Sequence, residues 1–168
     1  LAPLVMQGVT TVVAGNCGFS PAPVTEASKA LCESSSEMLR DRGLSYEWSS
    51  MGQWLDHLED KGLLLNAAFL VGHGTLRQAV MGNRSSAPDR REMEELRRLL
   101  RASLREGAFG MSAGLAYVPG VFAQNEELGR LLAALADEGA IFTVHGRAYV
   151  WISPFYKPML FGPPHNLR

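Results

Sequence analysis

The chain has 168 residues, 46% hydrophobic and 20% charged, a composition that supports a globular domain with a sizeable core and excludes a disordered chain. Its 16 basic and 17 acidic residues give a formal net charge of −1, so no electrostatic attraction to nucleic acid or to an anionic membrane is expected. No apolar run reaches the ~20 residues of a membrane span, no signal peptide is visible, and Cys17 and Cys32 are expected to be free thiols in the cytoplasm.

The first predicted strand covers residues 10–14, where an apolar, β-branched run without polar alternation indicates a strand buried on both faces. The residues before it are typical of the end of a helix that closes at Gly8. The strand breaks at Gly15, and Cys17 follows at its carboxyl end, where a thiol can face a cleft. A single cysteine is also often a small buried hydrophobe, so both interpretations of Cys17 stay open on these residues alone.

The second unit begins with residues 20–49, whose weak helical periodicity predicts helix interrupted by loops. Ser50 and Gln53 have the spacing of a capping box, which predicts a helix that ends at Gly62. Residues 63–71 are a continuous apolar run and predict a second buried strand. His73, between two glycines after this strand, either reaches a site or belongs to a tight turn that holds it by hydrogen bonds.

The third unit contains the clearest helix of the chain. Ser86–Asp89 supply a cap and a proline near the first helical position, and apolar residues at helical spacing continue to Gly107. Residues 108–112 predict a third strand, and the run then breaks at Gly114.

The fourth unit is a helix followed by a strand. Asn125 is predicted to cap the helix, with Glu126 and Glu127 in its positive first turn. The fourth strand is predicted at residues 141–144, and His145 lies immediately after it.

The alternation of four buried strands with helices predicts an α/β fold with a parallel sheet. The residues with reactive side chains follow the strands and do not precede them, as expected when strand carboxyl ends face a site. No Gly-x-Gly-x-x-Gly or P-loop favours an open, doubly wound sheet. We therefore expect part of a (β/α)8 TIM-type barrel, of which four strands are about half.

Two kinds of chemistry are compatible with these residues. Cys17 and His145 offer a thiolate and an imidazole, the donors that zinc prefers, although a catalytic zinc takes three protein ligands. Ser112 lies in a Gly-x-Ser-x-Gly sequence typical of a serine hydrolase, but Pro119 and Gly120 oppose the helix that should follow it. Tyr117 either presents its hydroxyl to a substrate or packs on the rim of the barrel.

Four segments, in the same order along the chain, resemble the D-aminoacylases, the N-acyl-D-amino-acid deacylases of the amidohydrolase superfamily. They are Gly-Val-Thr-Thr-Val-Val-Ala-Gly-Asn-Cys-Gly-Phe-Ser-Pro-Ala-Pro at residues 8–23, Gly-His-Gly-Thr-Leu-Arg at 72–77, Gly-Ala-Phe-Gly-Met-Ser-Ala-Gly-Leu-Ala-Tyr-Val-Pro-Gly at 107–120 and Thr-Val-His-Gly-Arg at 143–147. Four ordered matches are far more specific than any one of them.

This resemblance implies a zinc-dependent hydrolase of N-acyl amides, with N-acyl-D-amino acids as substrates. It implies that Cys17 and His145 are ligands of zinc and that Tyr117 contacts the substrate, while His73 and Arg147 are possible supporting residues around them. Zinc would polarise the amide carbonyl and lower the pKa of a bound water to about 7. The residues after His145, which begin with Ala148, depart from the family pattern and leave another amide or a cyclic amide as an alternative substrate.

The resemblance also implies that part of the site is missing. The family's His-x-His pair would lie before Leu1, and a further histidine ligand and the aspartate that acts as general acid and base would lie beyond Arg168. We therefore expect residues 1–168 to be the central portion of one barrel domain, about strands two to five, truncated at both ends and inactive alone. The alternatives are a serine hydrolase that uses Ser112 and a non-catalytic remnant or interaction module, with self-association through exposed barrel edges.

Overall fold

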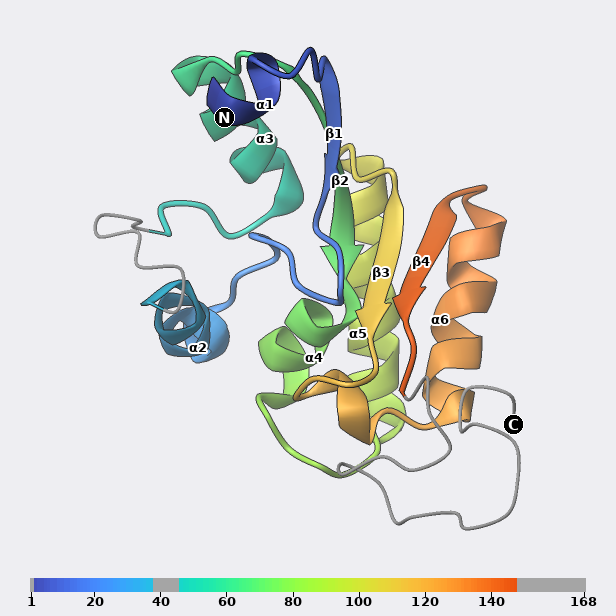
Figure 1. The fold of residues 1–168 in the computed structure, drawn as a ribbon. Helices are drawn as coiled ribbons and strands as arrows, with labels where there is room; N and C mark the ends of the chain where they lie inside the picture. The colour runs from blue at the N-terminus through green and yellow to red at the C-terminus, as the bar shows by residue number, and fades with distance from the viewer. Residues whose placement is uncertain (1, 38–45, 148–168) are drawn as a thin grey trace, which may run out of the picture.

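The computed structural model describes residues 2–37 and 46–147, which form one parallel sheet with helices packed against it (Figure 1). The elements in chain order are α1 (Ala2–Val5), β1 (Thr11–Ala14), α2 (Glu26–Glu37), α3 (Met51–Lys61), β2 (Asn66–Gly72), α4 (His73–Met81), α5 (Arg90–Arg105), β3 (Gly110–Gly114), a 3-10 turn η1 (Gly120–Phe122), α6 (Asn125–Asp137) and β4 (Ile141–His145).

The strands are parallel and lie in the order β1-β2-β3-β4, the order in which they occur in the sequence. A doubly wound sheet reverses direction near its middle, whereas here every crossover advances to the next strand in the same direction. The sheet therefore has the topology of successive βα units of a (β/α)8 barrel, as predicted.

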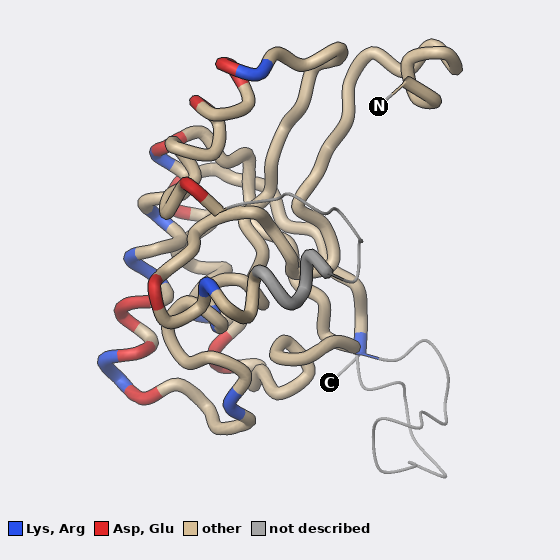
Figure 2. The backbone as a smooth tube through the Cα atoms, turned by 90° about the vertical axis from the view of Figure 1, so that its left-hand side faces the viewer, with Lys and Arg blue, Asp and Glu red and all other residues tan. Residues whose placement is uncertain are grey.

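The helices α5 and α6 cover one face of the sheet, behind it in Figure 1. Their leucines pack against alternate residues of the strands, among them Phe69, Met111 and Phe142, to form the main hydrophobic core. Most of the charged residues follow the outer surface of these helices, along one side of the molecule in Figure 2. The sequence therefore places its charges on the solvent side of the helical layer and leaves few on the opposite side of the sheet.

All four predicted strands are present, with ends that differ from the prediction by three residues or fewer. The prediction that every strand is buried on both faces is wrong for the outer strands. Val13 of β1 and Ile141 and Val144 of β4 are each about half exposed, whereas every residue of β3 is buried. The reason is position: within the described residues, β1 and β4 each have a neighbouring strand on one side only.

The capping box predicted at Ser50 and Gln53 is present only in part, and the cap predicted within Ser86–Asp89 is Asp89. Ser50 accepts a hydrogen bond from the Gln53 N–H, but the Gln53 side chain returns to Ser49. Asp89 and Glu92 form a complete box at the start of α5. The prediction of Asn125 as a cap is wrong by one residue, because Gln124 is the N-cap of α6 and its side chain makes no capping bond.

The helix α4 was not predicted, because the two glycines around His73 indicated a turn. The backbone instead continues from β2 directly into this helix, with Gly72 as its N-cap. Nearly all of α4 is buried, including the polar residues Thr75, Arg77 and Gln78. Buried polar side chains remove the contrast between an apolar and a polar face, which is the signal that periodicity detects.

None of the helices in the described part of the chain is both long and apolar enough to cross a membrane. The residues from Ala148 onward, where the sequence departs from the family pattern, lie outside the described residues.

Candidate metal site at the carboxyl ends of the strands

Cys17, Tyr117 and His145 meet at the carboxyl ends of the strands. The Cys17 Sγ lies 3.8 Å from the His145 Nδ1, across 128 positions of sequence. The Tyr117 hydroxyl lies 3.3 Å from the same nitrogen, and the two rings are in edge contact with centroids 4.8 Å apart. Three of the residues singled out from the sequence are thus brought together by the fold.

Cys17 has an unusual backbone conformation, with a φ of 58° in the left-handed region. Such conformations are costly for residues with a side chain and persist where the surroundings enforce them. Gly114 permits the close approach of the Cys17 carbonyl, because a Cβ at position 114 would overlap its oxygen. The loop of Cys17 is therefore pressed directly onto the end of β3.

Ser112 holds this loop in place from within the sheet. Its hydroxyl accepts a hydrogen bond from the Gly18 N–H at 3.0 Å and donates one to the Gly15 carbonyl. The side chain of Ser112 is fully buried in the middle of β3. A nucleophile elbow requires an exposed hydroxyl on a sharp strand-to-helix turn, so the geometry of a serine hydrolase is not present at Ser112.

A second contact links the loop of Cys17 to the strand of His145. The Thr143 hydroxyl lies 3.4 Å from the Asn16 Oδ1, and the Asn16 amide donates to the Val13 carbonyl. Because strand side chains alternate, Thr143 shares its face with His145 two residues later. The contact between Asn16 and Thr143 therefore helps to fix the distance between Cys17 and His145.

This separation suits two ligands of one zinc ion. Zinc bonds of about 2.3 Å to sulfur and about 2.0 Å to nitrogen in a tetrahedral arrangement place the two donor atoms about 3.6 Å apart. The observed Sγ–Nδ1 distance is 3.8 Å. Within residues 2–37 and 46–147, however, no cluster holds three or more His, Cys, Asp or Glu side chains that could surround a metal ion. The role of Cys17 and His145 as ligands stays a prediction.

His73 lies at the start of a helix and not in the tight turn considered from the sequence, while its place as a supporting residue of the site stays a prediction. It is the first residue of α4, fully buried, and its Nε2 lies 2.8 Å from the Glu127 Oε1. The other Glu127 oxygen accepts from Arg77 Nη1 at 2.5 Å. Burial raises the pKa of the Glu127 carboxyl, but the hydrogen bonds and charges of His73 and Arg77 outweigh it and hold the pKa below its usual value.

Arg77 and Glu127 were missed as partners of His73. A signal existed for Arg77, which lies four residues after His73 and therefore on the same face of a helix. Glu127 was assigned to the positive end of α6, which explains a carboxylate there without a specific partner. Only the tertiary structure shows that this carboxylate is turned inward toward His73 and Arg77, where it is 3% exposed.

Arg147 contacts the segment that follows Tyr117. Its guanidinium donates to the carbonyl of Val121 at 3.1 Å and to that of Ala123. These carbonyls flank the end of η1, so Arg147 ties the end of β4 to the segment after β3. Its place as a supporting residue at the site stays a prediction.

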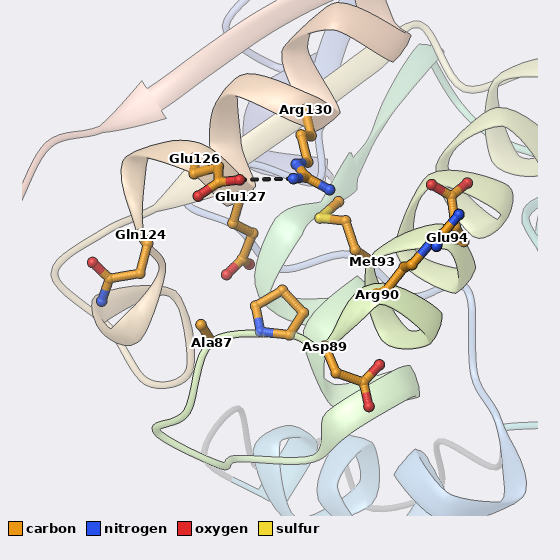
Figure 3. Close-up of a pocket in the computed structure, with 10 residues that line it drawn as sticks. Ala87, Asp89, Arg90, Met93, Glu94, Gln124, Glu126, Glu127 and Arg130 are labelled. Carbon is orange, nitrogen blue, oxygen red and sulfur yellow. Dashed lines mark hydrogen bonds and ion pairs between the residues drawn. The ribbon is translucent and has the colours of Figure 1, made fainter.

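A surface pocket of ≈ 560 Å³ lies elsewhere, between the amino-terminal ends of α5 and α6 (Figure 3). Its lining carries both signs of charge, and Glu126 and Arg130 are paired across 2.7 Å at its edge. The Glu127 side chain, which binds His73 and Arg77, also forms part of the lining. None of the residues that line it is Cys17, Tyr117 or His145, so this pocket is separate from the candidate metal site.

Comparison with known proteins finds relatives among the N-acyl-D-amino-acid deacylases. No family model matches the chain. A D-aminoacylase from Alcaligenes xylosoxydans xylosoxydans is 39% identical over 126 residues, which cover 75% of this chain and 25% of that protein. The chain thus spans about a quarter of the length of this curated relative.

Two solved structures agree with this similarity. The N-acyl-D-glutamate deacylase of Bordetella bronchiseptica, complexed with zinc and a phosphonate that mimics the tetrahedral intermediate, is 36% identical with a TM-score of 0.72; the match covers 86% of this chain and 29% of that one. A D-aminoacylase studied for its binuclear metal centre is 35% identical with a TM-score of 0.75, over 87% of this chain and 30% of that one. The described fold is therefore shared with proteins whose sequences are also related.

Proposed function

We propose that this chain, which is homologous to a segment of the D-aminoacylase and N-acyl-D-amino-acid deacylase family of the amidohydrolase superfamily, supplies part of the active site of a zinc-dependent deacylase. The observation that carries the proposal is the 3.8 Å approach of the Cys17 Sγ to the His145 Nδ1. The related deacylase of Bordetella bronchiseptica binds zinc, and the donor atoms here are of the kind and spacing that zinc requires.

In this proposal the residues of the chain divide the work between binding and orientation. Cys17 as a thiolate and His145 through Nδ1 would hold the metal, which when bound polarises the amide carbonyl and lowers the pKa of a bound water. Tyr117, 40% exposed and beside His145, can donate its hydroxyl proton in a hydrogen bond to a substrate carboxylate or carbonyl oxygen. The substrate class proposed is the N-acyl-D-amino acids, by analogy with the relatives.

Two ligands do not complete a catalytic zinc site, which takes three protein ligands and an open position. We propose that the remaining ligands and the general acid and base are supplied from outside residues 1–168. The isolated chain is then expected to bind metal weakly and to turn over no substrate.

Cobalt substitution tests the metal site directly, since Co²⁺ bound to a thiolate has a characteristic charge-transfer absorption. Titration of the chain with Co²⁺ is expected to produce this band, and Cys17→Ser is expected to remove it. His145→Ala should weaken binding by more than the about 10- to 100-fold that loss of an outer partner typically causes. A matched control is Cys32→Ser, because Cys32 is buried in the main core away from the site.

The activity is tested with N-acyl-D-amino acids and their L enantiomers. A longer chain that includes flanking sequence is expected to hydrolyse the D enantiomers, to lose activity on chelation and to lose it in Cys17→Ser. Hydrolysis that persists in Cys17→Ser would overturn the proposed role of this residue.

A further inference from the structure

The first turn of α4, residues His73 to Thr75, lies against the loop that carries Cys17. The Thr75 N–H donates to the Gly18 carbonyl at 3.1 Å, and the Thr75 hydroxyl accepts from the Ser20 N–H at 2.9 Å. Gly74 is required by the same approach, because a Cβ there would lie 2.8 Å from the Gly18 carbonyl oxygen. The residue next to Cys17 is thus docked on the start of a helix.

The same turn also lies against the loop that carries Tyr117. A Cβ placed on Gly74 would lie 3.6 Å from Pro119 Cδ, and one placed on Gly120 would lie 3.8 Å from the His73 Nδ1. Pro119 and Gly120 follow Tyr117 within three residues. One helical turn therefore contacts both segments whose side chains meet at His145.

The position of this turn is set by a buried network of charges. His73 Nε2 and Arg77 Nη1 bind the two oxygens of Glu127, and all three side chains are at most 1% exposed. Arg77 Nη2 also donates to the carbonyls of Arg84 and Ser86, at 3.1 and 3.0 Å. The network thus joins α4, α6 and the segment between α4 and α5.

The His73 imidazole is held from one side of its ring. Glu127 is a carboxylate that accepts at both oxygens, so the His73 Nε2 carries the hydrogen of their bond. Within the described residues, the His73 Nδ1 is buried and has no hydrogen-bond partner. A Cβ placed on Gly120 would lie 3.8 Å from this nitrogen, so the imidazole lies close beside the segment that follows Tyr117.

We propose that His73 is a positioning residue of the candidate metal site. Glu127, itself fixed by Arg77, holds the imidazole, and the imidazole with the first turn of α4 sets the loop of Cys17 against the loop of Tyr117. This role rests on the proposed function, but the arrangement of the two loops that His73 maintains exists without a metal and can be measured without one.

The test compares His73→Ala with Leu100→Ala in the metal-free chain of 168 residues. Leu100 is fully buried in α5 and packs in the main core, so its truncation lowers stability without contact with either loop. The readout is the NOE between the ring protons of Tyr117 and His145, whose centroids are 4.8 Å apart. We expect His73→Ala to lose this NOE, Leu100→Ala to keep it, and His73→Gln, which places an N–H near Glu127, to restore it.

Retention of the NOE in His73→Ala, or its equal loss in Leu100→Ala, would overturn the proposal, since His73 would then contribute to stability alone. If His73→Ala does not fold, Glu127→Gln takes its place, because it weakens the same network at nearly constant volume. Cobalt affinity is the second readout, with a loss of about 10- to 100-fold expected in His73→Ala and none in Leu100→Ala. Absence of cobalt binding in the unsubstituted chain contradicts the proposed function, while the NOE still decides the role of His73.

Discussion

At the scale of single residues, the chain uses polar side chains inside the fold to hold its loops. Ser112 shows this best, because its sequence context indicates a nucleophile while its hydroxyl is buried and bonded to two backbone groups of the Cys17 loop. A hydroxyl bonded in this way is a structural anchor. The same Gly-x-Ser-x-Gly sequence fits a nucleophile or an anchor of a loop, and the exposure of the serine hydroxyl distinguishes the two.

Ser112→Ala is expected to lower the free energy of unfolding, because Ser112 anchors the Cys17 loop and does not serve as a nucleophile. The substitution leaves the Gly18 N–H and the Gly15 carbonyl without their side-chain partner, and each unsatisfied buried group costs about 1–3 kcal/mol. Urea denaturation followed by circular dichroism measures the loss. Ser103→Ala is a control, since Ser103 is also buried but lies on α5, away from the Cys17 loop. Labelling of Ser112 by a fluorophosphonate probe in the folded chain would contradict this assignment.

Glu127 is expected to make stability depend on pH on the acid side. Its pKa in the folded chain lies below the usual value of 4.5, so its contribution is complete above that pH and is lost as the pH falls toward the folded pKa. Glu127→Gln removes this contribution and breaks a buried ion pair, at a cost of about 3–5 kcal/mol near neutral pH.

The measurement is the free energy of unfolding between pH 3 and pH 7 for both chains. The difference between them is expected to shrink as the pH falls below about 4.5. A difference that stays constant over this range would show that the carboxylate gains nothing from His73 and Arg77.

At the scale of elements, local signals were reliable where a helix or strand has one solvent face. Helix α5 has a complete capping box and arginines and glutamates paired three residues apart on its exposed side. Its boundaries were therefore predicted closely. Helix α4, buried on nearly every side, carries no such contrast and was not predicted.

Asp89→Ala is expected to destabilise the chain by about 1 kcal/mol, the usual loss when a capping carboxylate is removed. The Asp89 carboxylate accepts the Glu92 N–H at 2.8 Å, and the Glu92 side chain returns to the Asp89 N–H at 2.9 Å. Thermal denaturation gives the change. Asp137→Ala is the matched control, because its exposed ion pair with Arg101 contributes little. Equal losses in the two variants would mean that charge, not capping, is what Asp89 supplies.

At the scale of the whole molecule, β1 and β4 are the two edge strands of the described sheet. Val13 of β1 and Val144 of β4 are 51% and 52% exposed. Unpaired backbone groups beside exposed valines are a template for pairing with another chain.

We therefore predict that the 168-residue chain self-associates in a concentration-dependent manner. Light scattering of Val13→Lys and Val144→Lys is expected to show smaller particles than the unsubstituted chain, because a charged side chain on an edge strand opposes pairing. Leu64→Lys is the control: Leu64 is 73% exposed but lies before β2, outside the strands. A larger effect of Leu64→Lys would place the contact at the amino-terminal ends of the strands.

The sequence alone determined the fold class, the four strands, and which residues follow them, because hydrophobic periodicity and caps depend on near neighbours. It also identified Cys17, Tyr117 and His145 as candidates. Only the tertiary structure decided that these three meet, since positions 17 and 145 approach through the parallel register of distant strands. It also decided that Ser112 is an anchor and that His73, Arg77 and Glu127 form one network, because burial and partner choice are set by packing between elements and leave no local pattern.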